Sequence, residues 1–272
     1  VLGAPDGGQL EMGPLVATMV GTTLVAMAAS ILNQLWEVRF DRRMERTRGR
    51  PLVTGRVGSI AAVAASIVTA GLGLWILVEG THALTAGLAL ATLLSYVLVY
   101  TPLKRRATAN TLVGAVPGAL PILIGWSAAS GTLSGASGSL FAILFFWQVP
   151  HFLAIAWIYR EDYARGGFRM LSVTDPTGRR SGAMAVIYTL CLIAVSMGPS
   201  LLGVTGWFSV WAAPMSGIIM LVPAWRFAFA TTEENARSLF VASLVHLPLL
   251  LGILLCDPTP RLFSGTAPIL FR

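Results

Sequence analysis

The feature that most constrains this chain is a series of long apolar runs that contain few charges. An uninterrupted run of about 18 residues or more crosses a bilayer as an α-helix, whereas a membrane β-barrel would show short alternating segments. Only 11% of the 272 residues are charged, against roughly 25% in soluble domains. We therefore expect an all-α, polytopic membrane protein. The eight spanning helices are expected at approximately 14–36, 58–78, 84–101, 110–129, 138–158, 182–203, 206–228 and 238–256.

Basic residues are concentrated in alternate loops. All but two of the 19 lysines and arginines lie in loops that would share one membrane face: 39–56, 104–106, 160–180 and 226–237. The three loops expected on the other face, 79–85, 129–138 and 203–206, contain none. The positive-inside rule places the basic face in the cytoplasm, or in the matrix of an organelle. The net charge of +7 is thereby explained without nucleic acid, since no basic stripe with interleaved aromatic residues is present.

The beginning of the chain predicts a further helix. Residues 1–13 have neither the basic region nor the apolar core of a signal peptide. They resemble a loop on the face without lysine and arginine. A helix that crosses from the basic face should therefore precede them. We expect residues 1–272 to form one integral-membrane domain that lacks this first helix.

The first basic loop carries the strongest functional signal. Asn33, Glu37 and Asp41 are spaced by four, so on a helix each lies about 40° from the last, on one face. Three oxygen-bearing side chains at a helix end can bind a hard cation such as Mg²⁺. Anchoring at the membrane surface explains nearby arginines but not this spacing of the acids. We therefore predict a metal–diphosphate site, with Asn33, Glu37 and Asp41 as metal ligands and Arg42, Arg46 and Arg50 as phosphate contacts.

The second and third basic loops add candidates. Lys104 is the only lysine in the chain and offers a compact charge for a phosphate, although an anchoring role would also explain it. Gln148 and His151 lie inside an apolar run, where polar groups often mark a site but also bridge helices. The same alternatives apply to His246. The remaining candidates for substrate binding or catalysis are Tyr100, Arg105, Asn110, Arg160 and Asp162, with Asp162 expected to face the first acids across a cavity.

Three motifs together resemble one family. They read N-x3-E-x3-D-x2-M-x-R-T-x2-R-P-L from residue 33, Y-T-x-L-K-R from residue 100, and W-Q-x-P-H-F-x3-A-W-x2-R-x-D-Y-x2-G-G-x2-M-L from residue 147. In this order they resemble the protohaem IX farnesyltransferase (haem O synthase) family of the UbiA-type intramembrane prenyltransferases. The similarity extends from about residue 22 to residue 251.

The resemblance implies a bundle of nine transmembrane helices around a central cavity. It implies Mg²⁺ as cofactor, and it implies transfer of farnesyl from farnesyl diphosphate to the 2-vinyl group of protohaem IX (haem B). The first acidic motif maps onto Asn33, Glu37 and Asp41, and the second onto the region of Arg160 and Asp162, so the resemblance implies Asp162 as a further catalytic residue and Mg²⁺ ligand. The superfamily's further acid, four residues before Asp162, is replaced by Ile158. His151 is the expected haem contact, and haem A synthase or a terminal oxidase is the expected partner. The protein is expected in the cell inner (cytoplasmic) membrane, with the motif loops on the cytoplasmic side.

Three alternatives stay open. A related prenyltransferase acting on a quinone precursor would share the first motif but would not need W-Q-x-P-H-F. A secondary transporter would show an inverted repeat or paired broken helices, and neither is evident. A non-catalytic assembly protein would keep the fold around a degenerate site, which the intact set of Asn33, Glu37 and Asp41 argues against. Release of diphosphate separates enzymes from the other two classes, and the acceptor separates the two enzymes.

Overall fold

The computed structural model describes residues 11–257, and within them the chain is helical, with no strand. Eight helical spans are long and apolar enough to cross a membrane. They are α1 (Met12–Asp41), α2 (Ser59–Gly80), α3 to α4 (Ala83–Leu103), α5 (Asn110–Ser130), α6 (Gly135–Ile158), α9 to α10 (Arg179–Leu201), α11 to α12 (Trp207–Phe229) and α13 (Glu233–Cys256). The all-α membrane fold and its eight predicted spans are confirmed.

Three of these spans change their helical geometry along their length. The third consists of α3 (Ala83–Leu94), the π-helix η1 (Ser95–Tyr100) and α4 (Thr101–Leu103). The sixth contains α9 (Arg179–Val195) and α10 (Gly198–Leu201), and the seventh contains α11 (Trp207–Ser216) and α12 (Ile218–Phe229). The seventh breaks at Gly217, three residues after Pro214. A proline removes one backbone donor, and neighbouring helices tolerate the break.

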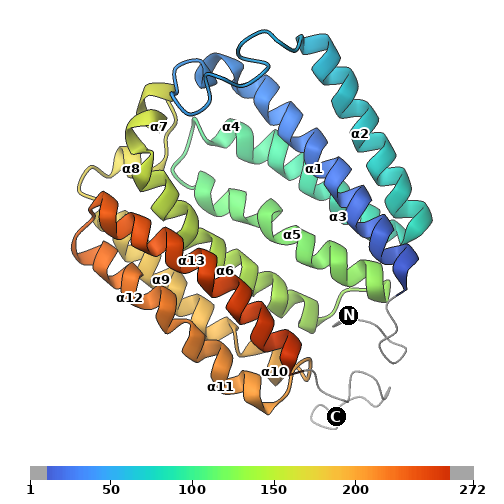
Figure 1. Ribbon diagram of the computed structural model, residues 1–272, viewed down its shortest axis with the longest axis vertical. Helices are drawn as coiled ribbons and strands as arrows, with labels where there is room; N and C mark the ends of the chain where they lie inside the picture. Colours follow the sequence, from blue (N-terminus) through green and yellow to red (C-terminus); the bar gives the residue numbers. More distant parts are fainter. Residues whose placement is uncertain (1–10, 258–272) are drawn as a thin grey trace.

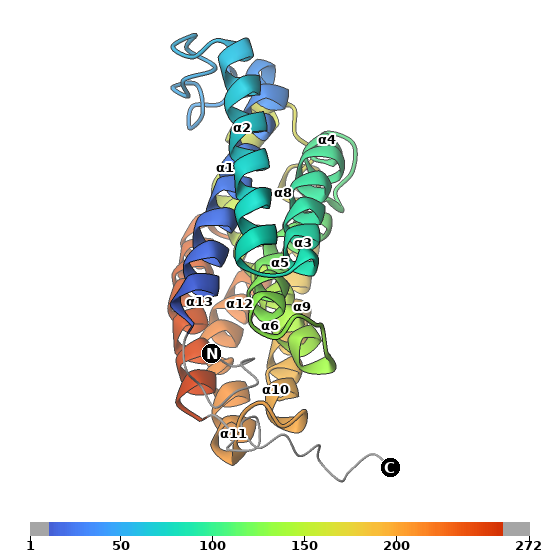
Figure 2. The ribbon, with the colours of Figure 1, turned by 90° about the vertical axis from the view of Figure 1, so that its right-hand side faces the viewer.

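The helices form two packed groups that share α5, as Figures 1 and 2 show. One core joins α1, α2, α3 and α5, and the other joins α6, α9 and the helices from α11 to α13. Small residues let α1 and α2 approach closely: a Cβ added at Gly21 would lie 2.8 Å from the carbonyl oxygen of Gly73. Large apolar side chains such as Ile60 and Trp207 are exposed on the outside, as expected of a surface that faces lipid.

The basic loops meet at one end of the bundle. The α1–α2 loop, α4 and the two short helices α7 (Arg160–Gly166) and α8 (Leu171–Thr174) lie together there in Figure 1. The backbone joins them directly, because the amide of Arg169 donates to the carbonyl of Lys104 at 2.8 Å. The fold therefore brings three motifs that are distant in the sequence to one place.

Candidate active site at the basic end of the bundle

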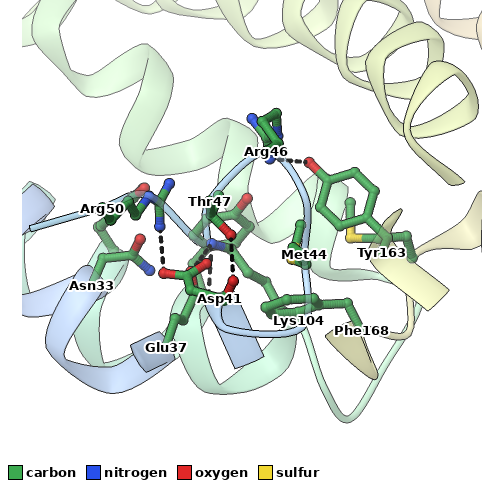
Figure 3. Close-up of a pocket in the computed structure, with 13 residues that line it drawn as sticks. Asn33, Glu37, Asp41, Met44, Arg46, Thr47, Arg50, Lys104, Tyr163 and Phe168 are labelled. Atoms are coloured by element: carbon green, nitrogen blue, oxygen red, sulfur yellow. Dashed lines mark hydrogen bonds and ion pairs between the residues drawn. The ribbon is translucent and has the colours of Figure 1, made fainter. Parts of the chain in front are cut away.

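A cavity of about 200 Å³ lies where α1 ends, between the α1–α2 loop, the η1–α4 segment and α7. Figure 3 shows its polar side chains converging. The lining residues come from all three motif regions and are Asn33, Glu37, Asp41, Met44, Arg46, Thr47, Arg50, Tyr96, Tyr100, Lys104, Tyr163, Phe168 and Met170.

Asn33, Glu37 and Asp41 share one face of α1, as their spacing predicts, and all three are at most 6% exposed. Burial of a carboxylate is costly unless a cation accompanies it. Lys104 supplies that cation for Glu37, with Nζ at 2.9 and 3.3 Å from the two carboxylate oxygens. Arg50 does the same for Asp41, with Nη1 at 2.7 Å from Oδ2. The wall of the cavity thus contains two buried carboxylates, each paired with a cationic side chain.

A buried threonine orients Asn33. The Asn33 Nδ2 donates to Thr101 Oγ1 at 3.0 Å, and that hydroxyl donates its own proton to the carbonyl of Tyr96 at 2.9 Å. Since a hydroxyl has one proton, Thr101 has to accept from the amide nitrogen. The amide oxygen of Asn33 is then left for the cavity. The carbonyl of Tyr96 belongs to the π-helix η1, a geometry that is frequent at functional sites.

The donor set fits a hard cation in type. The Oδ1 atoms of Asn33 and Asp41 have no hydrogen-bond partner among the described residues, and the Glu37 carboxylate stands between them on the helix face. No group of three or more His, Cys, Asp or Glu that could hold a metal occurs in residues 11–257. Mg²⁺ usually takes one or two carboxylates, waters and substrate phosphates rather than a complete protein cage. These residues therefore fit Mg²⁺, whose binding stays a prediction.

The α1–α2 loop brings Arg46 over two aromatic rings. Its guanidinium lies 5.2 Å from the ring centroid of Tyr159 and 5.7 Å from that of Tyr163, and Nη2 donates to the Tyr163 hydroxyl at 3.3 Å. Thr47 closes the same loop by donating to the carbonyl of Asp41 at 3.1 Å. Arg46 and Thr47 are thereby held at the cavity wall.

Asp162 does not line this cavity, so the expectation that it faces the first acids across one space is corrected. Its Oδ1 accepts from the amide of Glu45 at 2.7 Å and from Arg165 at 2.9 Å, and its Oδ2 accepts from the amide of Arg46 at 3.3 Å. Burial raises the pKa of this carboxyl, but these donors outweigh burial and leave the pKa below its usual value. Asp162 clamps the loop that carries Arg46.

Asp162 and Arg160 instead line a second cavity, of about 370 Å³, beside the first. It is also lined by Glu161, Arg165 and Glu233. Arg46 lies in the wall of both cavities.

Five further predicted residues lie outside both cavities: Arg42, Arg105, Asn110, Gln148 and His151. Arg105 covers the ring of Phe40 at 4.0 Å. The Asn110 amide donates to the carbonyls of Ala107 and Arg169, and the Gln148 amide donates to those of Ala115 and Leu144. These contacts hold loops and helices together.

Six residues of the cavity wall were missed by the sequence interpretation, and four of them share one signal. Met44, Thr47, Tyr163 and Met170 are themselves letters of the recognised motifs. Tyr96 lies outside the motifs but stands four residues before Tyr100, a helical spacing that would have found it. Phe168 occupies a variable position of the third motif, so no signal in the sequence marks it.

Comparison with known proteins supports one family. The model of the UbiA prenyltransferase family matches residues 2–247. A protoheme IX farnesyltransferase of Solibacter usitatus is 44% identical over 248 residues, which cover 91% of this chain and 85% of that protein. The human mitochondrial protoheme IX farnesyltransferase is 41% identical over 254 residues, which cover 93% of this chain. The chain spans 57% of the length of that human protein.

Two solved structures share the fold. One, described as digeranylgeranylglyceryl phosphate synthase in membranes, has a TM-score of 0.76 at 14% identity and covers 94% of this chain and 88% of its own. A UbiA homologue from Aeropyrum pernix K1 has a TM-score of 0.64 at 15% identity, covering 89% and 90%. Sequence, fold and the converging charged cavity agree: this chain belongs to the UbiA prenyltransferase family, in the branch of the protoheme IX farnesyltransferases.

Proposed function

We propose that the chain transfers the farnesyl group of farnesyl diphosphate to the 2-vinyl group of protohaem IX, giving haem O and diphosphate. The observation that carries this proposal is the buried cavity of Asn33, Glu37, Asp41, Lys104 and Arg50. It lies in a chain that is 44% identical over most of its length to a protoheme IX farnesyltransferase.

The charge of the cavity suits a diphosphate bound with a metal. Three cationic side chains, Arg46, Arg50 and Lys104, line it against two carboxylates, Glu37 and Asp41. One excess positive charge is less than the negative charge of a diphosphate, so Mg²⁺ completes the neutralisation. We propose that Asn33, Glu37 and Asp41 hold it, directly or through water. When bound, Mg²⁺ withdraws charge from the diphosphate and makes it a better leaving group.

The side chains of the cavity have distinct tasks in this reaction. Lys104 and Arg50 already point into the cavity, so they can contact the phosphate oxygens and hold the charge that develops as the C1–O bond of farnesyl breaks. The vinyl carbon of the acceptor then bonds to C1, and the resulting cation takes up water and releases one proton to give the hydroxyethylfarnesyl group. Preorganised charges of this kind need no rearrangement of solvent during the reaction.

The orientation in the membrane and the fate of the product complete the proposal. We propose that the basic end of the bundle faces the cytoplasm, or the matrix in a mitochondrion, because the basic loops gather there. The product would pass to haem A synthase or to a terminal oxidase. A prenyltransferase acting on a quinone precursor would use the same diphosphate cavity. The two activities differ only in the acceptor that receives the prenyl group.

Pigment analysis of membranes tests this function. The chain is expressed in cells that lack haem O, and extracted haems are separated by chromatography and identified by mass. We expect haem O with the unchanged chain and none with Asp41→Ala. The matched control is Glu79→Ala, which removes an exposed acid at the other end of the bundle. Well-inserted protein that yields no haem O would contradict the proposal, and prenylated quinone precursors would favour the alternative.

A further inference from the structure

Two carboxylates in the wall of the first cavity are paired with cations in different ways. Both oxygens of Glu37 accept from Lys104 Nζ, at 2.9 and 3.3 Å. Asp41 uses only Oδ2, which accepts from Arg50 Nη1 at 2.7 Å, and its Oδ1 has no partner among the described residues. A second cation on Glu37 would therefore lie against the Lys104 ammonium, and like charges repel, whereas Asp41 offers a free oxygen.

Two of the three predicted metal ligands are thus open to the cavity, and one is not. The Oδ1 atoms of Asn33 and Asp41 are unpartnered, yet neither is among the sealed, unpartnered polar atoms of residues 11–257. A group that enters the cavity can therefore reach both oxygens. Glu37 lies between them on α1 and is held by Lys104. A hard cation that arrives alone finds two protein oxygens instead of three, so it should bind weakly.

The ion pair of Glu37 and Lys104 resists the departure of either partner alone. Glu37 is 5% exposed, and the side chain of Lys104 is 12% exposed. A metal that displaced Lys104 would leave a buried ammonium unpaired. A phosphate that drew Lys104 away would leave a buried carboxylate unpaired, and a lone buried charge is strongly unfavourable. When a metal and a diphosphate arrive together neither charge is left alone, because the metal compensates Glu37 and the phosphate compensates Lys104.

Lys104 is held so that only its side chain needs to move. Its amide donates to the carbonyl of Tyr100 at 3.1 Å, and its carbonyl accepts from the amide of Arg169 at 2.8 Å. The ammonium lies 4.6 Å from the centroid of the Tyr100 ring, a cation–π contact that does not depend on Glu37. A lysine has a flexible stem and three donors. Its ammonium can therefore turn from Glu37 to a phosphate oxygen while the backbone and the contact with Tyr100 persist.

We propose that Lys104 couples the binding of the metal to the binding of the diphosphate. Without diphosphate, Lys104 occupies Glu37 and the metal site has two ligands. With diphosphate, Lys104 turns to the phosphate, and Glu37 becomes the third ligand of the metal. Arg50 needs no such exchange, because Asp41 can offer Oδ1 while Oδ2 keeps its arginine. The identity of the two ligands rests on the proposed function, whereas the ion pairs of Figure 3 are observed independently of it.

The first test is binding of Mn²⁺ alone to the purified full chain, followed by the loss of the electron paramagnetic resonance signal of free Mn²⁺. Mn²⁺ prefers the same oxygen ligands as Mg²⁺. Lys104→Gln releases Glu37, so we expect it to bind Mn²⁺ at least about fivefold more tightly than the unchanged chain, the lower end of the usual coupling between two sites. Lys104→Arg keeps a cation at Glu37 and should bind Mn²⁺ like the unchanged chain.

Arg50→Gln is the matched control, because it removes the same charge from the same cavity. The Oδ1 atom of Asp41 is already open without this change. We therefore expect a smaller gain in Mn²⁺ affinity than in Lys104→Gln. Equal gains in the two variants would reduce the effect to net charge and overturn the proposal, as would the absence of any gain in Lys104→Gln.

A second measurement does not require a lone buried carboxylate. The double variant Glu37→Gln/Lys104→Gln replaces the ion pair by two neutral amides, so it leaves no unpaired charge. The Mn²⁺ affinity is measured with and without inorganic diphosphate. Direct contact between Mn²⁺ and diphosphate raises the affinity in every variant, and the exchange adds to this only where Glu37 and Lys104 are both present. We expect a larger gain in the unchanged chain and in Arg50→Gln than in the double variant, and equal gains would overturn the proposal.

A separate assay of haem O formation distinguishes this inference from the proposed function. A chain that forms haem O, but in which Lys104→Gln and Arg50→Gln bind Mn²⁺ alike, would remove the coupling and leave the function. The expected order of Mn²⁺ affinities in a chain that transfers no farnesyl to protohaem would keep the coupling and remove the function.

Discussion

Asp41 and Asp162 are two buried carboxylates in neighbouring parts of the molecule, and both are paired with an arginine, but their oxygens are used differently. The Oδ2 atom of Asp41 accepts a hydrogen bond from Arg50, and its Oδ1 atom has no partner among the described residues. Asp41 lies in the wall of the first cavity. Both carboxylate oxygens of Asp162 accept hydrogen bonds from the protein, from two backbone amides and from Arg165. One acid is available to a ligand, and the other holds the loop beside it.

The difference arises from the backbone around each acid. Asp41 is the last residue of α1, whose helical hydrogen bonds already occupy the nearby amides. Asp162 stands in the first turn of α7, opposite amides of the α1–α2 loop that have no helical partner. Unpaired amides attract a carboxylate and consume its acceptor capacity. An acidic motif therefore marks a ligand site only where the backbone nearby is already satisfied.

Replacing Asp41 should have the largest effect. Asp41→Asn keeps the shape of the side chain but removes a negative charge from the cavity. We expect transfer to fall about 100- to 1000-fold, the range seen when one preorganised electrostatic group is lost. Rates with farnesyl diphosphate and protohaem measure this, with thermal unfolding as the check on folding. A fall of less than tenfold would place the reacting charges elsewhere.

Thr101 should matter next, because it orients Asn33 from outside the cavity. Thr101→Val keeps the volume but cannot accept from the Asn33 amide, so the amide oxygen loses its fixed direction. We expect the Mn²⁺ affinity of the purified protein, measured by electron paramagnetic resonance, to fall about tenfold. Thr101→Ser keeps the hydroxyl and should bind like the unchanged chain. Equal binding by Thr101→Val and Thr101→Ser would show that the orientation of Asn33 is irrelevant.

Asp162→Asn should have a smaller effect than Asp41→Asn and act through the loop. It weakens the clamp on Glu45 and Arg46, so we expect mainly a higher KM for farnesyl diphosphate. The increase should be about tenfold, the weight of one hydrogen bond to a charged group at about 1.5 kcal/mol. Faster proteolysis within the α1–α2 loop would accompany it. If kcat fell as far as in Asp41→Asn, Asp162 would be part of the reacting site and the contrast between the two acids would fail.

Low pH should weaken the same hydrogen bonds, because it protonates the Asp162 carboxylate that accepts them. Because the folded-state pKa of Asp162 lies below its ordinary value of 3.8, ionised Asp162 stabilises the fold above that pH. The contribution is lost as the pH falls through the lower, folded-state pKa. The difference in thermal stability between the unchanged chain and Asp162→Asn should therefore be constant near neutral pH and shrink below about pH 4. A difference that is the same at pH 3 and pH 7 would contradict the clamp.

Much of the fold could be predicted from the sequence, because membrane helices are specified by local composition. The eight spans and the shared face of Asn33, Glu37 and Asp41 follow from run length and from spacing within one helix. The pairing of Glu37 with Lys104 could not be predicted, since 67 residues separate them and the geometry depends on how η1 packs. The clamp of Asp162 on Glu45 spans 117 residues and uses a backbone amide, which leaves no trace in residue identity.

Some residues of the candidate site could be predicted from the sequence and others could not. Residues on one helix face, and the neighbouring Arg46, Arg50, Tyr100 and Lys104, reach the cavity as predicted. Gln148 was selected because polar groups are rare in apolar runs, and Asn110 because it follows the Y-T-x-L-K-R motif. Both bond to carbonyls of neighbouring segments instead. Polarity alone does not separate a ligand contact from a bond between helices.

The most direct test of the charged cavity is transfer of labelled farnesyl from farnesyl diphosphate to protohaem by purified protein, compared between Asp41→Asn and Asp162→Asn with and without Mg²⁺. We expect labelled haem O from the unchanged chain only with Mg²⁺, retention of kcat by Asp162→Asn, and loss of transfer by Asp41→Asn. Transfer that persists in Asp41→Asn, or that is independent of divalent metal, would contradict the assignment of this cavity.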